Sequence, residues 1–306
     1  EAEIADTLSH ASRDVINTIK EVGGGNVFLY DADLRDPVAV EKIFKDENFT
    51  AVIHCAGLKA VGESVKKPLD YYRSNLDITL TLLEAMSRGG VRRLIFSSSA
   101  TVYGNPADPC YTEDLTLTEA SSPYGNTKIL NERLITDFAK TNENFSAVLL
   151  RYFNPVGAHP SGLLGENPKG TPNNLFPYMA KVAKGELPEL EVFGNDYGTR
   201  DGTPIRDYLH VVDLAKGHVK AFDYTIKNKG VHAFNLGRGE GSSVLECVAA
   251  FEKASGKSIP YKIGARRDGD LPEYWANPAK AKEILGWSAE LTLDDMCRDA
   301  WNFANK

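Results

Sequence analysis

Short apolar runs alternate with amphipathic runs through the first half of the chain, and this alternation restricts the possible fold more than any other feature. Continuous apolar, partly β-branched runs are typical of strands that are buried on both faces of a sheet. Four are predicted as strands: Val27–Tyr30, Ala51–Cys55, Arg93–Ser98 and Ser146–Arg151. The runs with helical spacing are Ser12–Val22, Pro37–Lys45, Pro68–Arg88 and Tyr124–Thr141. This alternation predicts an α/β fold with a right-handed, doubly wound parallel sheet.

Polar residues and glycines follow the predicted strands, where a sheet of this kind binds its ligands. Asp33 comes shortly after the first strand, Cys55-Ala56-Gly57 end the second, and Ser97-Ser98-Ser99 end the third. Because the carboxyl ends of parallel strands lie along one edge of the sheet, we expect these residues to line a single cleft.

Tyr124 and Lys128 are four residues apart, so a helix places both on one face. Ser99, at the end of a predicted strand, precedes this helix. A phenol of ordinary pKa is a poor base at neutral pH, but a neighbouring ammonium group favours the phenolate. We therefore predict that Tyr124 transfers a proton, with Lys128 and Ser99 beside it.

The composition argues against several classes of protein. The 306 residues are 42% apolar and 25% charged, which suits one large domain or two smaller ones. A net charge of −7 argues against nucleic acid as a partner, and no apolar run approaches the ~18 residues that would span a membrane. The four cysteines have no metal-binding spacing, so we expect reduced thiols, no metal and a cytoplasmic protein.

The sequence pattern changes after about Pro155. From there on, segments rich in Gly, Pro and Asn, which predict loops, alternate with short predicted helices and strands. We expect residues 1–155 to form the domain that contains the doubly wound sheet. Residues 156–306 are predicted to form a smaller α+β lobe, with the ligand site between the two.

The start of the chain differs from that of a usual nucleotide-binding sheet, which opens with a strand, a Gly-rich turn and a helix that binds a pyrophosphate. Ile4-Ala5-Asp6 fits the end of the second strand of such a sheet, with Asp6 as the acidic residue that binds ribose hydroxyls. We therefore expect the sheet to lack its first strand and turn. A chain truncated in this way should bind its dinucleotide weakly.

Six segments together resemble those of the UDP-glucose 4-epimerase family, also called UDP-galactose 4-epimerases, among the extended short-chain dehydrogenases/reductases. The segments are Val52–Ser64, Phe96–Gly104, Ser122–Lys128, Leu150–Gly162, Pro172–Leu175 and Arg206–Ala215. The likeness runs from Asp6 to the end of the chain. It implies a Rossmann-type sheet with NAD in the first domain and a UDP-hexose substrate in the second lobe. It also implies a homodimer formed through the helices Pro68–Arg88 and Tyr124–Thr141.

The resemblance also implies roles for particular residues. Tyr124 would be the acid/base, Lys128 would bind the nicotinamide ribose and keep Tyr124 acidic, and Ser99 would hydrogen-bond the sugar hydroxyl. Besides Tyr124 and Lys128, the residues that would contact NAD are Asp6, Thr7, Asp33, Leu34, Cys55, Ala56, Gly57, Lys59, Asn75 and Phe153. Besides Ser99 and Tyr124, those that would hold the UDP-hexose are Asn154, Asn174, Leu175, Phe193, Arg206, Arg267, Asp270 and Tyr274.

More than one function is compatible with these residues. In an epimerase, the Tyr124 phenolate would remove the proton of the sugar 4-hydroxyl while hydride passes from C4 to NAD, and hydride would return to the other face of the 4-keto sugar. A nucleotide-sugar dehydratase typically has Asp-Glu directly after the position of Ser99, where this chain has Ala100-Thr101. A reductase on the same scaffold and a catalytically silent module that binds UDP-sugar or NAD are also open.

Overall fold

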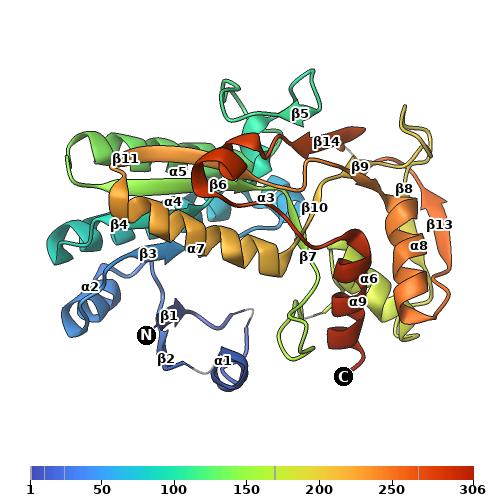
Figure 1. Ribbon diagram of the computed structural model, residues 1–306, viewed down its shortest axis with the longest axis horizontal. Helices are drawn as coiled ribbons and strands as arrows, with labels where there is room; N and C mark the ends of the chain where they lie inside the picture. The colour runs from blue at the N-terminus through green and yellow to red at the C-terminus, as the bar shows by residue number, and fades with distance from the viewer. Residues whose placement is uncertain (1, 10, 24, 169, 268) are drawn as a thin grey trace.

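The computed structural model describes residues 2–306 except residues 10, 24, 169 and 268, and it shows an α/β architecture with two lobes (Figure 1). The first lobe contains a parallel sheet with the strand order β11-β6-β4-β3. These strands are β3 (Val52–His54), β4 (Arg93–Ser97), β6 (Ser146–Tyr152) and β11 (Gly230–Leu236). Figure 1 shows α5 (Pro123–Lys140) and α7 (Val211–Lys227) on opposite sides of this sheet. The predicted doubly wound parallel sheet is therefore confirmed.

Two of the four predicted strands, β4 and β6, lie where both faces of the sheet are covered. Residues 146–151 of β6 are all buried, and Ile95 and Phe96 of β4 are completely shielded from solvent. Burial on both faces explains why these strands are continuous apolar runs rather than alternating ones. The other predicted helices lie close to their expected ranges, as α1 (Val15–Gly23), α2 (Pro37–Asp46) and α4 (Pro68–Gly89).

The two strands nearest the N-terminus stand apart from the larger sheet. β1 (Ala2–Asp6) pairs in parallel with β2 (Val27–Asp31), and no other strand in the described part of the chain extends this pair. β3 is the edge strand of the larger sheet, and its Ile53 side chain is 53% exposed. In the described part of the chain, β1 and β2 are therefore not hydrogen-bonded to the sheet that contains β3.

The boundary between the lobes differs from the expected one at residue 155. After β7 (Asn154–Val156) the chain enters the second lobe, but α7 and β11 return to the first, and β11 pairs with β6 over its full length. Leu214 of α7 belongs to the same buried core as this sheet. The assignment of all residues from 156 to 306 to the second lobe is therefore wrong, because residues 230–236 complete the sheet of the first.

The second lobe packs helices around a core that includes Phe176, Phe251 and Met296. These helices are α6 (Leu175–Ala183), α8 (Val244–Ser255) and α9 (Leu293–Ala304). The shorter strands are β5 (Cys110–Tyr111), β8 (Leu190–Phe193), β9 (Ile205–Arg206), β10 (Tyr208–His210), β12 (Ser242–Ser243), β13 (Tyr261–Gly264) and β14 (Glu273–Ala276). Further helical segments are α3 (Val61–Lys66), η1 (Ala100–Tyr103) and η2 (Ala281–Leu285). Within the described ranges, no helix combines the length and the apolar character needed to cross a membrane.

A buried carboxylate joins segments that are far apart in the sequence. Asp207, between β9 and β10, accepts hydrogen bonds from three backbone N–H groups, those of Arg238 (2.9 Å), Gly239 (3.1 Å) and Ala276 (3.1 Å). A Cβ at Gly237 would lie 2.5 Å from Asp207 Oδ2, so the close approach requires glycine. Burial raises the pKa of the Asp207 carboxyl to about 6, although the N–H donors oppose this shift. Asp207 thus holds the Gly-rich turn after β11 beside β14.

We predict that Asp207→Ala lowers the free energy of unfolding at pH 8 by about 3 kcal/mol or more, because three buried N–H groups lose their acceptor at about 1–3 kcal/mol each. Urea denaturation followed by circular dichroism measures this change. Asp137→Ala, which removes only an exposed ion pair with Lys140, is the control and should leave the urea midpoint nearly unchanged. Equal urea midpoints for Asp207→Ala and wild type would contradict the prediction.

Candidate active site

The N-terminus of α5 packs closely against the segment that follows β4. Ser122 caps the helix by accepting a hydrogen bond from the N–H of Gly125 (3.2 Å), and Pro123 occupies the first helical position, where an N–H has no partner within the helix. A Cβ at Gly125 would lie 2.5 Å from the Cβ of Ala120 and 3.1 Å from the carbonyl oxygen of Thr101. The absence of a side chain at Gly125 therefore lets the first turn of α5 approach η1 directly.

The structure brings Tyr124, Lys128 and Ser99 together at the end of β4. The Ser99 hydroxyl lies close enough to the Tyr124 hydroxyl to lower the pKa of the phenol. The Nζ atom of Lys128 lies 5.8 Å from the centroid of the Tyr124 ring and donates a hydrogen bond to the carbonyl oxygen of Ser97 at 2.7 Å. Ser99 Oγ accepts from the N–H (3.2 Å) and the hydroxyl (3.0 Å) of Thr101, so its own proton is free for donation to Tyr124.

The ionisation of this cluster differs from the sequence expectation. Burial raises the pKa of Tyr124, and the hydrogen bond with Ser99 only partly offsets that shift. Burial also lowers the pKa of Lys128 to about 8, against the opposing charges of Cys55 and Glu132. This direction is opposite to the one expected beside an ammonium group, because desolvation is the largest influence on the pKa of the phenol.

The loop after β3 is fixed by hydrogen bonds to the buried side chain of Asn75. This amide accepts from the N–H of Leu58 (2.8 Å) and donates to the Leu58 carbonyl oxygen (3.0 Å) and to Thr127 Oγ1 (3.0 Å). Gly57 has a φ of 142°, and a Cβ there would lie 2.9 Å from Asn75 Oδ1. Asn75 thus ties the segment Cys55–Lys59 to α5.

The residues expected at the adenosine end of NAD lie at the ends of β1 and β2. Asp6 and Thr7 are exposed where β1 ends. Asp33 follows β2 and forms a hydrogen bond with Arg35 (2.9 Å), which lowers the pKa of the Asp33 carboxyl. Leu34 packs against the core between α2 and α4. Polar groups at these two neighbouring strand ends fit ribose hydroxyls and an adenine edge.

The positions at β3 and β4 fit the other end of such a cofactor. Cys55 and Gly57 are exposed at the carboxyl end of β3, and Ala56 packs beside the α2–α4 core. Gly57 is required here by its positive φ and by the close approach of Asn75, which together fix the turn of the backbone at the end of β3. Four parallel strand ends therefore contribute residues that suit one extended nucleotide.

Aromatic rings of the two lobes meet around Phe153. Tyr274 of β14 stacks on Tyr111 of β5, with 5.6 Å between ring centroids and 6° between ring planes. The Tyr274 ring also lies 6.0 Å from that of Phe153. The guanidinium group of Arg206 lies 4.7 Å from the Tyr274 centroid, in a geometry that favours a cation–π interaction. This arrangement links the end of β6 to the second lobe.

Two arginines of the second lobe share the carboxylate of Asp270. Arg206 lies 3.7 Å and Arg267 3.3 Å from its oxygens. The guanidinium group of Arg267 lies 4.3 Å from the centroid of Phe193, and the Arg267 side chain is 58% exposed. Guanidinium groups beside an aromatic ring suit an anionic ligand with a flat base, because they can pair with phosphate oxygens while the ring covers the base.

The remaining predicted ligand residues lie where the lobes meet. Asn154 starts β7, and Asn174 directly precedes α6, which begins at Leu175. The Asn174 amide donates to Glu166 Oε1 (2.9 Å), and Lys59 Nζ donates to the same oxygen (3.3 Å). Glu166 thus connects a predicted cofactor residue to a predicted substrate residue. The sequence analysis did not identify it, because it lies in an irregular loop without periodicity.

The sequence analysis also missed the buried ion pair between Glu132 and Arg151. Their side chains are 6% and 7% exposed and form two hydrogen bonds of 2.9 and 2.6 Å. Glu132 lies four residues beyond Lys128. The helical spacing that identified Tyr124 and Lys128 therefore contained the signal for this carboxylate as well.

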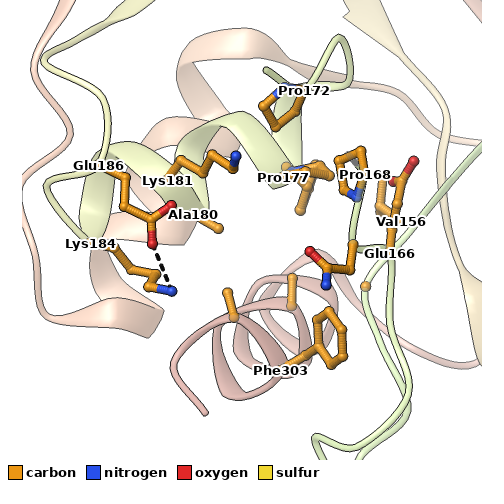
Figure 2. Close-up of a pocket in the computed structure, with 15 residues that line it drawn as sticks. Val156, Glu166, Pro168, Pro172, Pro177, Ala180, Lys181, Lys184, Glu186 and Phe303 are labelled. Atoms are coloured by element: carbon orange, nitrogen blue, oxygen red, sulfur yellow. Dashed lines mark ion pairs between the residues drawn. The ribbon is translucent and has the colours of Figure 1, made fainter. Parts of the chain in front are cut away.

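A separate cavity of about 120 Å³ lies between α6 and α9 in the second lobe. Figure 2 shows Pro177 and Ala180 on one side of it and Phe303 on the other. Neither Tyr124 nor Lys128 lines this cavity. No group of three or more potential metal-binding side chains occurs among the residues the structure describes.

Known proteins with similar sequences and structures identify the family. The profile of the NAD dependent epimerase/dehydratase family matches residues 3–237. The chain is 53% identical to the UDP-glucose 4-epimerase of Bacillus subtilis over 303 residues, which is 99% of this chain and 89% of that one. The human UDP-glucose 4-epimerase is also 53% identical, over 94% of this chain and 83% of its own.

A solved structure gives the same result. UDP-glucose 4-epimerase from Bifidobacterium longum, in complex with NAD+ and UDP, has a TM-score of 0.95 at 50% identity over 99% of this chain and 90% of that one. The resemblance found in the sequence is thereby confirmed, and the chain belongs to the NAD dependent epimerase/dehydratase family and, within it, to the UDP-glucose 4-epimerases.

Proposed function

We propose that the protein interconverts UDP-galactose and UDP-glucose with NAD as cofactor. The observation that carries this proposal is the contact of Tyr124 with Ser99 and Lys128 at the end of β4, in a chain that is 53% identical to a UDP-glucose 4-epimerase. The solved relative from B. longum binds NAD+ and UDP, ligands that match the two groups of residues on either side of Tyr124.

The chemistry at the sugar centres on Tyr124. As the phenolate, Tyr124 would take the proton of the sugar 4-hydroxyl and become the neutral phenol, and before that transfer the Ser99 hydroxyl would donate a hydrogen bond to the phenolate oxygen. Bound NAD would accept the hydride from sugar C4 and return it. Lys128, anchored on the carbonyl oxygen of Ser97, would bind the nicotinamide ribose. The other residues proposed to hold NAD are Asp6, Thr7, Asp33, Leu34, Cys55, Ala56, Gly57, Lys59, Asn75 and Phe153.

The uridine diphosphate is proposed to anchor the substrate while the 4-keto sugar turns over. Arg206 and Arg267 would pair with the diphosphate, and Phe193 would cover the uracil ring. The other residues proposed for this side are Asn154, Asn174, Leu175, Asp270 and Tyr274. Strong contacts to the nucleotide and few to the sugar allow hydride to return to either face of C4.

The structure also bears on a dehydratase function. β-Elimination needs an additional acid next to the residue that matches Ser99. Ala100 and Thr101 follow Ser99 in η1, and Glu132, the carboxylate that binds Ser98, is already paired with Arg151. These observations favour epimerisation over elimination of water.

We place NAD binding in the first lobe, including α7 and β11, and UDP-hexose binding in the second. The thiols of Cys55, Cys110, Cys247 and Cys297 are free, which supports a reducing compartment such as the cytoplasm.

We predict that Tyr124→Phe lowers kcat for the conversion of UDP-galactose to UDP-glucose by roughly 10²-fold or more, because general acid–base catalysis contributes roughly that factor. Production of UDP-glucose, coupled to UDP-glucose dehydrogenase, measures the rate. Tyr261→Phe, which removes the hydroxyl of an exposed tyrosine on β13, is the control and should keep full activity. An active Tyr124→Phe enzyme, or a wild-type product that has lost water, would refute the proposed function.

We predict that Arg267→Ala weakens the binding of UDP by roughly ten-fold or more, since a charge-assisted hydrogen bond to phosphate contributes about 1.5–3 kcal/mol. Isothermal titration calorimetry with UDP measures the dissociation constant. Arg266→Ala is the matched control, because this neighbouring arginine pairs with Asp196 instead of Asp270. Equal losses of affinity in the two variants would show that Arg267 has no specific contact with the nucleotide.

We further propose a homodimer through α4 and α5, supported by exposed leucines on both helices, Leu69 (79%), Leu80 (44%) and Leu130 (39%). Leu80→Arg should produce a monomer, because it places a charge in the proposed apolar interface. Size-exclusion chromatography with light scattering measures the mass. Leu163→Arg, at a comparably exposed leucine of the second lobe, should remain dimeric. A monomeric wild type, or a dimeric Leu80→Arg, would contradict this arrangement.

A further inference from the structure

Three successive turns of α5 each contact one of three successive serines. Lys128 Nζ donates to the carbonyl oxygen of Ser97, and the Tyr124 hydroxyl lies close enough to the Ser99 hydroxyl for Ser99 to lower its pKa. Between them, Ser98 Oγ donates to Glu132 Oε1 at 2.5 Å. Because Tyr124, Lys128 and Glu132 are spaced by four residues, one face of the helix holds the whole segment.

The serine segment needs these anchors because it leaves the sheet. The pairing of β4 with β6 ends at Ser97, opposite Leu150, so Ser98 and Ser99 lie beyond the ladder. Ser98 is nevertheless only 1% exposed, and the backbone turns there, with the N–H of Ser98 donating to the carbonyl oxygen of Phe96 at 3.0 Å. The position of Ser99 therefore depends on side-chain contacts and on η1, whose Val102 N–H donates to the Ser99 carbonyl oxygen at 3.2 Å, rather than on strand pairing.

The Glu132 carboxylate is itself held rigidly. Arg151 binds both of its oxygens, and the second guanidinium branch donates to the Tyr103 hydroxyl at 3.1 Å. Tyr103 in turn donates to Asn235 Oδ1 at 2.6 Å. These groups come from α5, β6, η1 and β11, so the orientation of the carboxylate is set by four elements of the first lobe.

We propose that Glu132 and Ser98 are positioning residues for the reaction: the carboxylate, locked by Arg151, holds the Ser98 hydroxyl and thereby places the Ser99 hydroxyl against Tyr124. This inference rests on the proposed function. A buried ion pair is often no more stabilising than apolar side chains of similar volume. An apolar pair could not provide the hydrogen-bond acceptor that the Glu132 carboxylate offers to the Ser98 hydroxyl near Tyr124.

The test is the variant Ser98→Ala, which leaves Glu132 paired with Arg151 and removes only the hydroxyl. We expect kcat with UDP-galactose to fall roughly ten-fold, because a small displacement of Ser99 disturbs the alignment at Tyr124. KM should stay within roughly two-fold of wild type, since the nucleotide contacts are remote from Ser98. If Ser98 had a purely structural role, Ser98→Ala would lower the free energy of unfolding, but it would not lower kcat while leaving KM unchanged.

Ser64→Ala is the matched control, because Ser64 is also buried and its hydroxyl donates only to the carbonyl oxygen of Val61 (2.6 Å). This variant should keep the wild-type kcat. Crystal structures of wild type and Ser98→Ala give a readout that does not depend on activity: the distance between the Ser99 and Tyr124 hydroxyl oxygens should be longer in the variant. Wild-type kcat in Ser98→Ala, or an unchanged contact between Ser99 and Tyr124, would overturn the inference. An inactive wild type would instead refute the proposed function.

Discussion

The docking of α5 against the end of β4 is the interaction on which the geometry of the site depends. Gly125 lets the first turn of the helix reach η1, and the following turns bring an ammonium group and a carboxylate to the serines. Both charged groups are buried: Glu132 is paired with Arg151, whereas Lys128 donates a hydrogen bond to a carbonyl oxygen and its pKa falls to about 8 through desolvation. Unpaired charges at these depths would destabilise the fold strongly.

Buried polar side chains also join segments that the order of the chain keeps apart. Asn75 connects α4 to the loop after β3 and to α5, and Asp207 connects β9 and β10 to the turn after β11 and to β14. Each of these two side chains forms hydrogen bonds with more than one backbone group. Such contacts fix loop positions that hydrophobic packing leaves undetermined, because apolar contacts have little directional preference.

The two halves of the site differ in physical character. Around Tyr124 the groups are half-buried or buried, and desolvation raises the pKa of the phenol. In the second half, Arg267 is exposed whereas Arg206 is largely buried, and Asp270 balances both guanidinium groups. A partly desolvated reaction centre strengthens hydrogen bonds to developing charge, while an exposed guanidinium is ready to exchange a carboxylate for a phosphate. This division suits an enzyme that holds a nucleotide firmly and leaves the sugar free to turn.

Local patterns along the chain were sufficient to predict most elements of the first lobe and part of its chemistry. Apolar runs located β2, β3, β4 and β6, and the four-residue spacing of Tyr124 and Lys128 placed both on one helical face. Long-range packing was needed to show that β11 completes the first sheet, that Glu132 meets Arg151, and that burial raises the pKa of Tyr124. Periodicity records neighbours along a helix or strand, whereas these features depend on residues many positions apart and on how completely they exclude water.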